Sequence, residues 1–188
     1  MRILWLLAFI WAFASPALAS TPALSFTDKY DEQIKEGVWR YWPDFPFWKA
    51  WKAQLYQESR LNPDAISPVG ARGLAQFMPA TWAEVSQELS YGMVSSHIAK
   101  YAIEAGAYYM AKQRRFWRST NDPDRQQLAQ ASYNAGAGNI RKAQHLCNNR
   151  LYEGIISCLP SVTGRHAQET IIYVKRILRY WHILEAQK

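Results

Sequence analysis

The chain has 188 residues and a formal net charge of +7, from 22 lysines and arginines against 15 aspartates and glutamates. Removal of a leader of 19 residues would leave about 169 (188 minus 19), which is enough for one sizeable core and short for two domains. Beyond that leader, no stretch is apolar enough to span a membrane, and neither an internal repeat nor a low-complexity linker is present. We therefore expect a single domain.

The first 19 residues have the pattern of a secretory signal peptide. Arg2 supplies a positive start, residues 3–14 form an apolar core, and Ala17-Leu18-Ala19 is a small-x-small cleavage site. An uncleaved membrane anchor is the alternative, but about a dozen apolar residues fall short of the roughly 20 that span a bilayer. We expect cleavage after Ala19, no stable membrane span afterwards, and a periplasmic or secreted protein. No cysteine follows the site, so we expect no lipid attachment there.

Charge and aromatic content together indicate the kind of partner. Without Arg2 the charge is about +6 (7 minus 1), and the whole chain holds 9 tryptophans and 11 tyrosines. Aromatic rings stack on the apolar faces of sugars, and cations hold a polyanion nearby. Nucleic acid would suit the same composition, but an exported protein seldom meets it. We therefore expect an anionic, sugar-rich polymer and no nucleic acid.

The sequence predicts an all-α protein, because no run of alternating β-branched residues is present. Helices are expected near residues 28–41, 45–60, 79–89, 96–118, 123–135, 138–148 and 166–186. Pro79 suits a first helical turn, Ser95 or Ser96 can cap the fourth helix, and Gly136 can end the fifth in a left-handed conformation.

Two further patterns concern packing. The fourth helix is expected to bury the stripe formed by Ile98, Tyr101, Ala105 and Tyr109. The segment before residue 46 carries aromatic residues that could cap the core or extend a sugar-binding rim, and we favour the core. These residues are Trp39, Tyr41, Trp42 and Phe45.

The second predicted helix carries a carboxylate on its apolar face. Trp48, Trp51 and Leu55 recur at helical spacing, and the next position on that face is Glu58. Removal of water from the ionised form raises a carboxyl pKa, which suits a general acid near neutral pH. The alternative is that Glu58 lies on a frayed helix end, since Asn62-Pro63 stops the helix.

Cys147 and Cys158 are the only cysteines. In an oxidising compartment we expect them to form a disulfide, which for so short a loop contributes roughly 2 to 4 kcal/mol. A zinc site that adds His145 and His166 is the alternative, but the spacing matches no familiar zinc pattern.

Three blocks of sequence point to a known family. The block near the acid comprises Glu58-Ser59, Asn62-Pro63, Ser67-Pro68-Val69-Gly70-Ala71, Gly73-Leu74-Ala75-Gln76 and Met78-Pro79-Ala80-Thr81. The later blocks are Ala131-Ser132-Tyr133-Asn134-Ala135-Gly136, and Glu169-Thr170 with Tyr173-Val174. In this order they resemble the soluble lytic transglycosylase (SLT) domain family, which is lysozyme-like, of the glycoside hydrolase family 23 type, and cleaves bacterial cell-wall glycan. The resemblance extends from about Trp48 to about Trp181, and Ala75 stands where the family usually carries Met.

The resemblance implies a lysozyme-like domain with a substrate cleft over residues 46–188, after a helical extension over residues 20–45. It implies that Glu58 protonates the oxygen between N-acetylmuramic acid and N-acetylglucosamine, then takes the proton of the muramoyl 6-hydroxyl as that oxygen attacks its own anomeric carbon. A 1,6-anhydromuramoyl end results, with no metal or organic cofactor. The residues implied to line the cleft are Ser67, Gln76, Met78, Tyr133, Asn134, Glu169 and Tyr173.

A second carboxylate decides between this reaction and its nearest rival. A hydrolase resembling goose-type lysozyme would need one to activate water. Asp64 lies in the loop beyond the proline with nothing to aim it, and Glu169 is the better candidate because it sits in a matched block. A non-catalytic wall-binding or assembly protein is the alternative outside enzymes. Peptidoglycan strands are the expected partner, and a wall-spanning secretion or conjugation apparatus is a further candidate.

Overall fold

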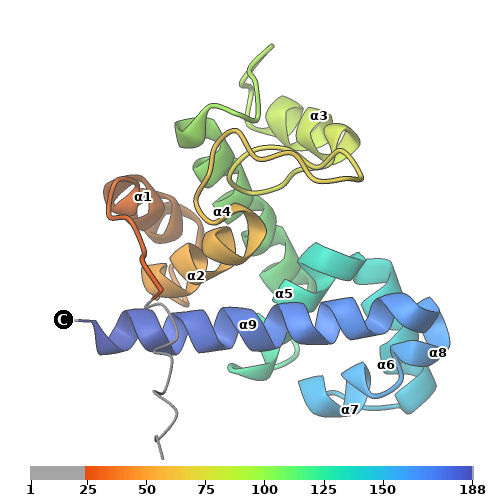
Figure 1. Cartoon of the computed structure of the whole chain (residues 1–188). Helices are drawn as coiled ribbons and strands as arrows, with labels where there is room; N and C mark the ends of the chain where they lie inside the picture. The colour runs from red at the N-terminus through yellow and green to blue at the C-terminus, as the bar shows by residue number, and fades with distance from the viewer. Residues whose placement is uncertain (1–23, 188) are drawn as a thin grey trace, which may run out of the picture.

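Helices form every regular element between residues 24 and 187, the part of the chain that the computed structural model describes (Figure 1). The predicted signal peptide, residues 1–19, lies outside this part. The helices are α1 (Asp31–Tyr41), α2 (Trp48–Ser59), α3 (Pro79–Glu88), α4 (Ala99–Phe116), α5 (Asp124–Ala135), α6 (Ala137–Cys147), α7 (Tyr152–Ile156), α8 (Pro160–Thr163), the 3₁₀ turn η1 (Gly164–His166) and α9 (Ala167–Ala186). The all-α prediction is confirmed.

The C-terminal helix α9 is the longest element and organises the others. Its 20 residues correspond to about 30 Å, and in Figure 1 it runs across the molecule. α9 packs against both α2 and α5, while α1 packs on α2 and α4, and α4 on α5. Side chains from α2, α5 and α9, far apart in sequence, are therefore brought to one region.

Trp51 of α2 is at the centre of the core. Its ring is fully buried, with its centroid 5.9 Å from that of Trp42. The indole N–H of Trp42 donates to the carbonyl of Ala107, 2.7 Å away, which fastens the chain after α1 to α4. Beneath Trp51, α4 carries Gly106, where a Cβ would lie 2.5 Å from Trp51 Cζ2. The Trp51 ring can therefore lie against α4 only because residue 106 has no side chain.

The N-terminal aromatic residues divide between core and surface. Trp42 and Phe45 are buried, as favoured from the sequence, and Tyr41 is half-buried with its hydroxyl donating to Glu104 Oε1. Trp39 is 60% exposed on α1, so the core prediction is wrong for this residue.

The start of α4 differs from the prediction. The helix begins at Ala99 after an N-cap at Ile98 that makes no side-chain cap, and Ser95 Oγ instead accepts the N–H of His97 in a turn. Ile98 is exposed because it lies before the first helical turn. The serine cap is therefore wrong, and so is the buried position expected for Ile98, whereas Ala105 of the predicted stripe is buried and Tyr101 and Tyr109 are half-buried. The buried face of α4 consists of Ala102, Ile103, Ala105, Gly106, Ala107, Met110, Ala111, Gln113 and Arg114.

Other helix boundaries follow the sequence more closely. Pro79 stands in the first turn of α3 as predicted. Gly136 ends α5 at a φ of 84°, but its ψ of 132° places it outside the left-handed helical region that we expected. The sequence did not predict α7 and α8, because helices of 5 and 4 residues are too short to show a helical period.

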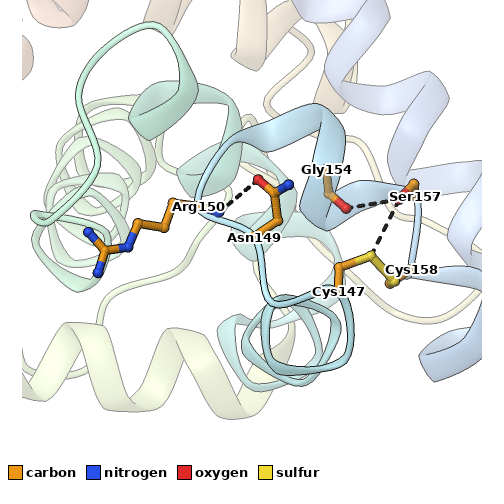
Figure 2. The surroundings of a disulfide bond; sticks show 6 residues. All are labelled: Cys147, Asn149, Arg150, Gly154, Ser157 and Cys158. Atoms are coloured by element: carbon orange, nitrogen blue, oxygen red, sulfur yellow. Dashed lines mark hydrogen bonds between the residues drawn. A yellow bond between two sulfur atoms is a disulfide. The ribbon is translucent and has the colours of Figure 1, made fainter.

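Cys147, the last residue of α6, forms a disulfide with Cys158, beyond α7 (Figure 2). Their Cα atoms are 5.9 Å apart, and the bond closes the loop that contains α7. Sulfurs bonded to each other leave no thiolate for the zinc alternative.

Replacing Gly106 by alanine should destabilise the fold by about 1 to 3 kcal/mol, because the added methyl group overlaps the Trp51 ring. Chemical denaturation measures this free energy. Gly138→Ala, in α6, is the matched control: a Cβ there meets nothing within 4 Å, so the change should be neutral or stabilising. Equal effects of the two substitutions would contradict this account of the α2–α4 contact.

Candidate active site

Glu58 lies in the last turn of α2, and this end of the helix is fixed. Ser59 donates its hydroxyl to the carbonyl of Leu74, 2.9 Å away, and so ties the helix end to the following loop. The chain then leaves the helix through left-handed conformations at Arg60 and Leu61, with φ of 57° and 61°. The alternative of a frayed helix end is therefore wrong, and Glu58 has a defined position.

The partner of Glu58 comes from α9. The buried Tyr173 hydroxyl donates to Glu58 Oε1, with 2.5 Å between the oxygens. Glu58 Oε2 makes no hydrogen bond to any residue in 24–187. The side chain is half-buried, which leaves this second oxygen as the one that can meet a ligand.

Burial controls the protonation of this carboxyl. Loss of water raises the pKa of Glu58 from 4.5 to about 8, and the Tyr173 hydrogen bond partly opposes the rise because it favours the ionised form. Burial, together with the nearby charge of Glu58, in turn raises the pKa of Tyr173 well above its usual value, so the phenol stays a neutral donor. At neutral pH, Glu58 is therefore mostly protonated and can act as an acid.

Tyr133 reaches the same region from α5, but its hydroxyl has a structural partner. It donates to the carbonyl of Ala75, 2.8 Å away, which joins α5 to the loop before α3. Burial and then the Glu58 charge raise the pKa of Tyr133 well above its usual value. The resemblance implied that Tyr133 lines the cleft, whereas here its hydroxyl fixes the loop. Because the backbone of Ala75 makes this bond, the departure from Met at this position leaves the contact intact.

The loop between α2 and α3 uses its polar side chains internally. Ser67 Oγ accepts the N–H of Ala71 at 3.0 Å, and Gln76 Nε2 donates to the carbonyls of Gly73 and Ala65 at 2.9 and 3.2 Å. Gln76 itself has a positive φ of 47°. These two predicted binding residues therefore hold the loop in shape. Met78, also predicted, is 44% exposed at the start of α3 and is free to meet a ligand.

A pocket lined by Tyr173, the hydrogen-bond partner of Glu58, brings three of the predicted residues together, although Glu58 itself is not among its lining residues. Its lining consists of Gln57, Asn134, Glu169, Ile172, Tyr173 and Arg176. A second pocket shares Asn134 and Glu169 with it and continues towards Asn139 and His166. Asn134 is held in place by Thr170, whose hydroxyl donates to Asn134 Oδ1 at 2.7 Å. The two pockets adjoin at Asn134 and Glu169 along the N-terminal half of α9, and together they are called the cleft.

The sequence did not identify Gln57, Ile172 or Arg176 as cleft residues. A signal was present, because Glu169, Tyr173 and Arg176 are four and seven residues apart and so share one face of a helix. Arg176 is exposed and makes no ion pair within the described chain, so its guanidinium is available to an anionic group in the cleft.

The two candidate second carboxylates lie differently. Asp64 is exposed in the loop, where its backbone N–H bonds to Asn62 Oδ1. Glu169 is exposed, lines the cleft and makes no hydrogen bond within residues 24–187. Over the same residues, no other carboxyl group hydrogen-bonds to Glu58. No group of three or more His, Cys, Asp or Glu side chains there is arranged to hold a metal ion.

Residues 49–155 match the profile described as the transglycosylase SLT domain. This chain belongs to the SLT domain family. The family prediction is confirmed. The matched residues include Glu58 and the block around Tyr133.

Similar proteins carry this domain within longer chains. A membrane-bound lytic murein transglycosylase F from Desulfosudis oleivorans is 31% identical over 158 residues, which are 75% of this chain and 34% of that protein. The one from Shewanella halifaxensis is 30% identical over 155 residues, which are 73% of this chain and 31% of that protein. This SLT-family chain thus spans about a third of the length of these curated relatives.

Solved SLT structures have the same fold. The 70-kDa soluble lytic transglycosylase SLT70 of Escherichia coli superimposes with a TM-score of 0.65 at 27% identity, over 83% of this chain and 24% of that one. A lytic transglycosylase Slt from Pseudomonas aeruginosa, solved as an inactive glutamate-to-glutamine mutant, gives 0.68 at 25% identity, over 84% and 24%. A bulgecin A complex of the 70-kDa enzyme gives 0.69 at 25% identity, over 87% and 25%.

Glu58→Gln should alter how stability depends on pH. A carboxyl whose pKa rises from 4.5 unfolded to about 8 folded contributes stability that is fully present below pH 4.5 and is lost as the pH rises through 8. The glutamine does not titrate, so the variant keeps its stability as the pH rises. At pH 9 it should be more stable than the wild type by at least about 1 kcal/mol.

Urea denaturation of both proteins at pH 5 and pH 9 tests this. The quantity to compare is the change in the free energy of unfolding between the two pH values, which cancels effects of the amide itself. An identical change in wild type and variant would mean that Glu58 titrates normally.

Proposed function

We propose that this protein is an exported peptidoglycan lytic transglycosylase that cleaves the β-1,4 bond between N-acetylmuramic acid and N-acetylglucosamine, with Glu58 as acid and then base. The observation that carries the proposal is a desolvated carboxyl with a pKa of about 8, held by Tyr173 beside a cleft. Relatives named lytic murein transglycosylases support the substrate class, and the inactive glutamate-to-glutamine mutant of a structural relative supports a glutamate as the essential group.

In the first step, protonated Glu58 acts as a general acid. Tyr173 occupies Oε1, so Oε2 faces the glycosidic oxygen and delivers the proton to it. The bond between the anomeric carbon and this oxygen breaks, and its electron pair stays with the oxygen. N-acetylglucosamine leaves with a free 4-hydroxyl, and Glu58 is left as a carboxylate that the Tyr173 hydroxyl stabilises.

In the second step, the Glu58 carboxylate acts as a base. It takes the proton of the muramoyl 6-hydroxyl while that oxygen bonds to the anomeric carbon. Glu58 returns to its protonated form, and no water is consumed. A carboxyl whose pKa lies near the working pH suits both steps, because it can release its proton in the first step and take one up in the second. Within residues 24–187 no second carboxyl hydrogen-bonds to Glu58 or to Tyr173, and this supports internal attack over hydrolysis, in which a second carboxylate usually activates water.

The cleft residues have supporting roles in this proposal. Asn134, fixed by Thr170, and Gln57 can hydrogen-bond sugar substituents, and Met78 offers an apolar wall. Ser67, Gln76 and Tyr133 act mainly by holding the loop and its backbone groups against the acid. Glu169 can accept hydrogen bonds from sugar hydroxyls in the cleft.

Export is part of the proposal. The signal-like residues 1–19 support it, and the relatives named membrane-bound murein transglycosylases support a location in the cell envelope. Among the described residues, no helix combines the length and the apolar character that crossing a bilayer requires. A wall-spanning secretion or conjugation apparatus stays a candidate partner, resting on the sequence reasoning alone.

The purified protein should release muropeptides that end in 1,6-anhydromuramic acid from peptidoglycan, detected by mass spectrometry as products lighter by one water than hydrolytic ones. Glu58→Gln should lower the rate by at least about 10² to 10⁴, since only the transferable proton is lost. The helical circular dichroism spectrum should be unchanged in this variant.

Borohydride reduction separates the rival reactions. Reducing muramic ends as the main product would replace the transglycosylase by a hydrolase, with Glu169→Gln and Asp64→Asn as the next variants. Comparable digestion by Glu58→Gln would remove Glu58 from the mechanism, and no digestion by the wild type would favour a wall-binding protein.

A further inference from the structure

A polar pocket that is separate from the cleft lies where α6 ends. Six of its lining residues are Arg141, Gln144 and His145 of α6 with Asn148, Asn149 and Arg150 of the following loop. It shares no residue with the cleft beside Glu58. In Figure 1 the end of α6 and the loop to α7 lie on one side of α9, and the loop from α2 to α3 lies on the other. A ligand held here would therefore not touch the acid.

The pocket is positively charged and has no internal counter-charge. No aspartate or glutamate lines it, and neither Arg141 nor Arg150 forms an ion pair within residues 24–187. Arg141 is nonetheless held in place: its guanidinium lies 4.7 Å from the Phe116 ring centroid and 5.5 Å from that of Trp117, and Nη1 donates to Gln144 Oε1 at 3.1 Å. Stacking and a neutral hydrogen bond orient this cation without neutralising it.

The loop that carries Arg150 is held by three features. The Cys147–Cys158 disulfide closes it, and Asn149 Oδ1 accepts the backbone N–H groups of Arg150 and Leu151 at 2.8 and 2.9 Å. Gly154 makes room for Asn149, since a Cβ at residue 154 would lie 2.2 Å from Asn149 Cγ. Figure 2 shows the Arg150 side chain extending away from the disulfide. The cation is thus presented from a braced loop, which lowers the entropy cost of binding an anion.

We propose that this pocket binds the carboxylates of peptidoglycan stem peptides and so anchors the enzyme on the wall at a distance from the bond being cut. The inference rests on the proposed function for the identity of the polymer. Guanidinium groups match carboxylates with paired hydrogen bonds, and the side-chain N–H groups of Asn148 and Asn149 add donors at the same place. Stem peptides supply several carboxylates along each strand, so a site of this charge suits them.

Binding to purified sacculi tests the proposal without cleavage. The parent protein is full-length Glu58→Gln, which leaves the wall intact, and the test variant adds Arg141→Gln and Arg150→Gln. The control variant adds Lys175→Gln and Arg179→Gln, which remove the same charge. These two exposed cations of α9 line neither this pocket nor the cleft. Co-sedimentation should show binding by the test variant weakened at least about tenfold, with the control close to the parent.

Two further surfaces identify the ligand. On sacculi stripped of peptides by an amidase, and on vesicles of equal parts phosphatidylglycerol and phosphatidylcholine, parent and test variant should bind alike. Equal binding of test and control variants to intact sacculi would overturn the site. If the test variant lost as much binding on stripped sacculi or on vesicles as on intact sacculi, the stem peptide would not be the ligand. Formation of anhydro ends by protein with native Glu58 is measured separately, so the proposed function stands or falls independently.

Discussion

The hydrogen bond between Tyr173 and Glu58 is the interaction on which the proposed chemistry depends. It joins α9 to α2 across 115 residues of sequence and occupies one carboxyl oxygen while leaving the other free. Burial alone would raise the pKa of Glu58 further and make the carboxyl a weaker acid. The phenol opposes this shift, so the carboxyl stays near the point where it can both give and recover a proton.

The aromatic core supplies the rigidity that this contact needs. Trp51 lies two turns before Glu58 on α2, and its close approach to Gly106 fixes the helix against α4. Two further hydrogen bonds, from Ser59 to Leu74 and from Tyr133 to Ala75, bind the loop after α2 to the same frame. A site of this kind has to hold its groups within a fraction of an ångström, and here the core and the loop share that role. The polar residues of the loop are therefore largely committed to its own shape.

The sequence predicted the parts of the molecule that depend on local pattern. The spacing of Trp48, Trp51 and Leu55 placed Glu58 on an apolar face, and α2 does carry it there, half-buried. The longer helices and the family also followed from the sequence. The partner of Glu58 could not be derived from spacing, because Tyr173 lies on another helix and the resemblance gave it only a place in the cleft.

The remaining differences have physical causes of the same kind. Ser95 failed to cap α4 because its hydroxyl found a nearer backbone donor in a turn, and local competition of this type is invisible in a cap pattern. Gln76 was expected to meet substrate, but its left-handed backbone turns the amide onto Gly73 and Ala65. The cleft residues Gln57 and Arg176 were missed because neither belongs to a matched sequence block. Non-local packing, rather than propensity, decides these positions.

The protonation state of Glu58 can be measured directly. Carbon-13 NMR of protein labelled at glutamate side-chain carboxyls gives a titration curve for each residue, and the signal absent from Glu58→Gln assigns the one of interest. The account predicts a midpoint near 8 for Glu58, and a still higher one in Tyr173→Phe because that variant loses the bond that favours the carboxylate. A midpoint near 4.5 in the wild type would show an ordinary carboxylate at neutral pH and would contradict the account.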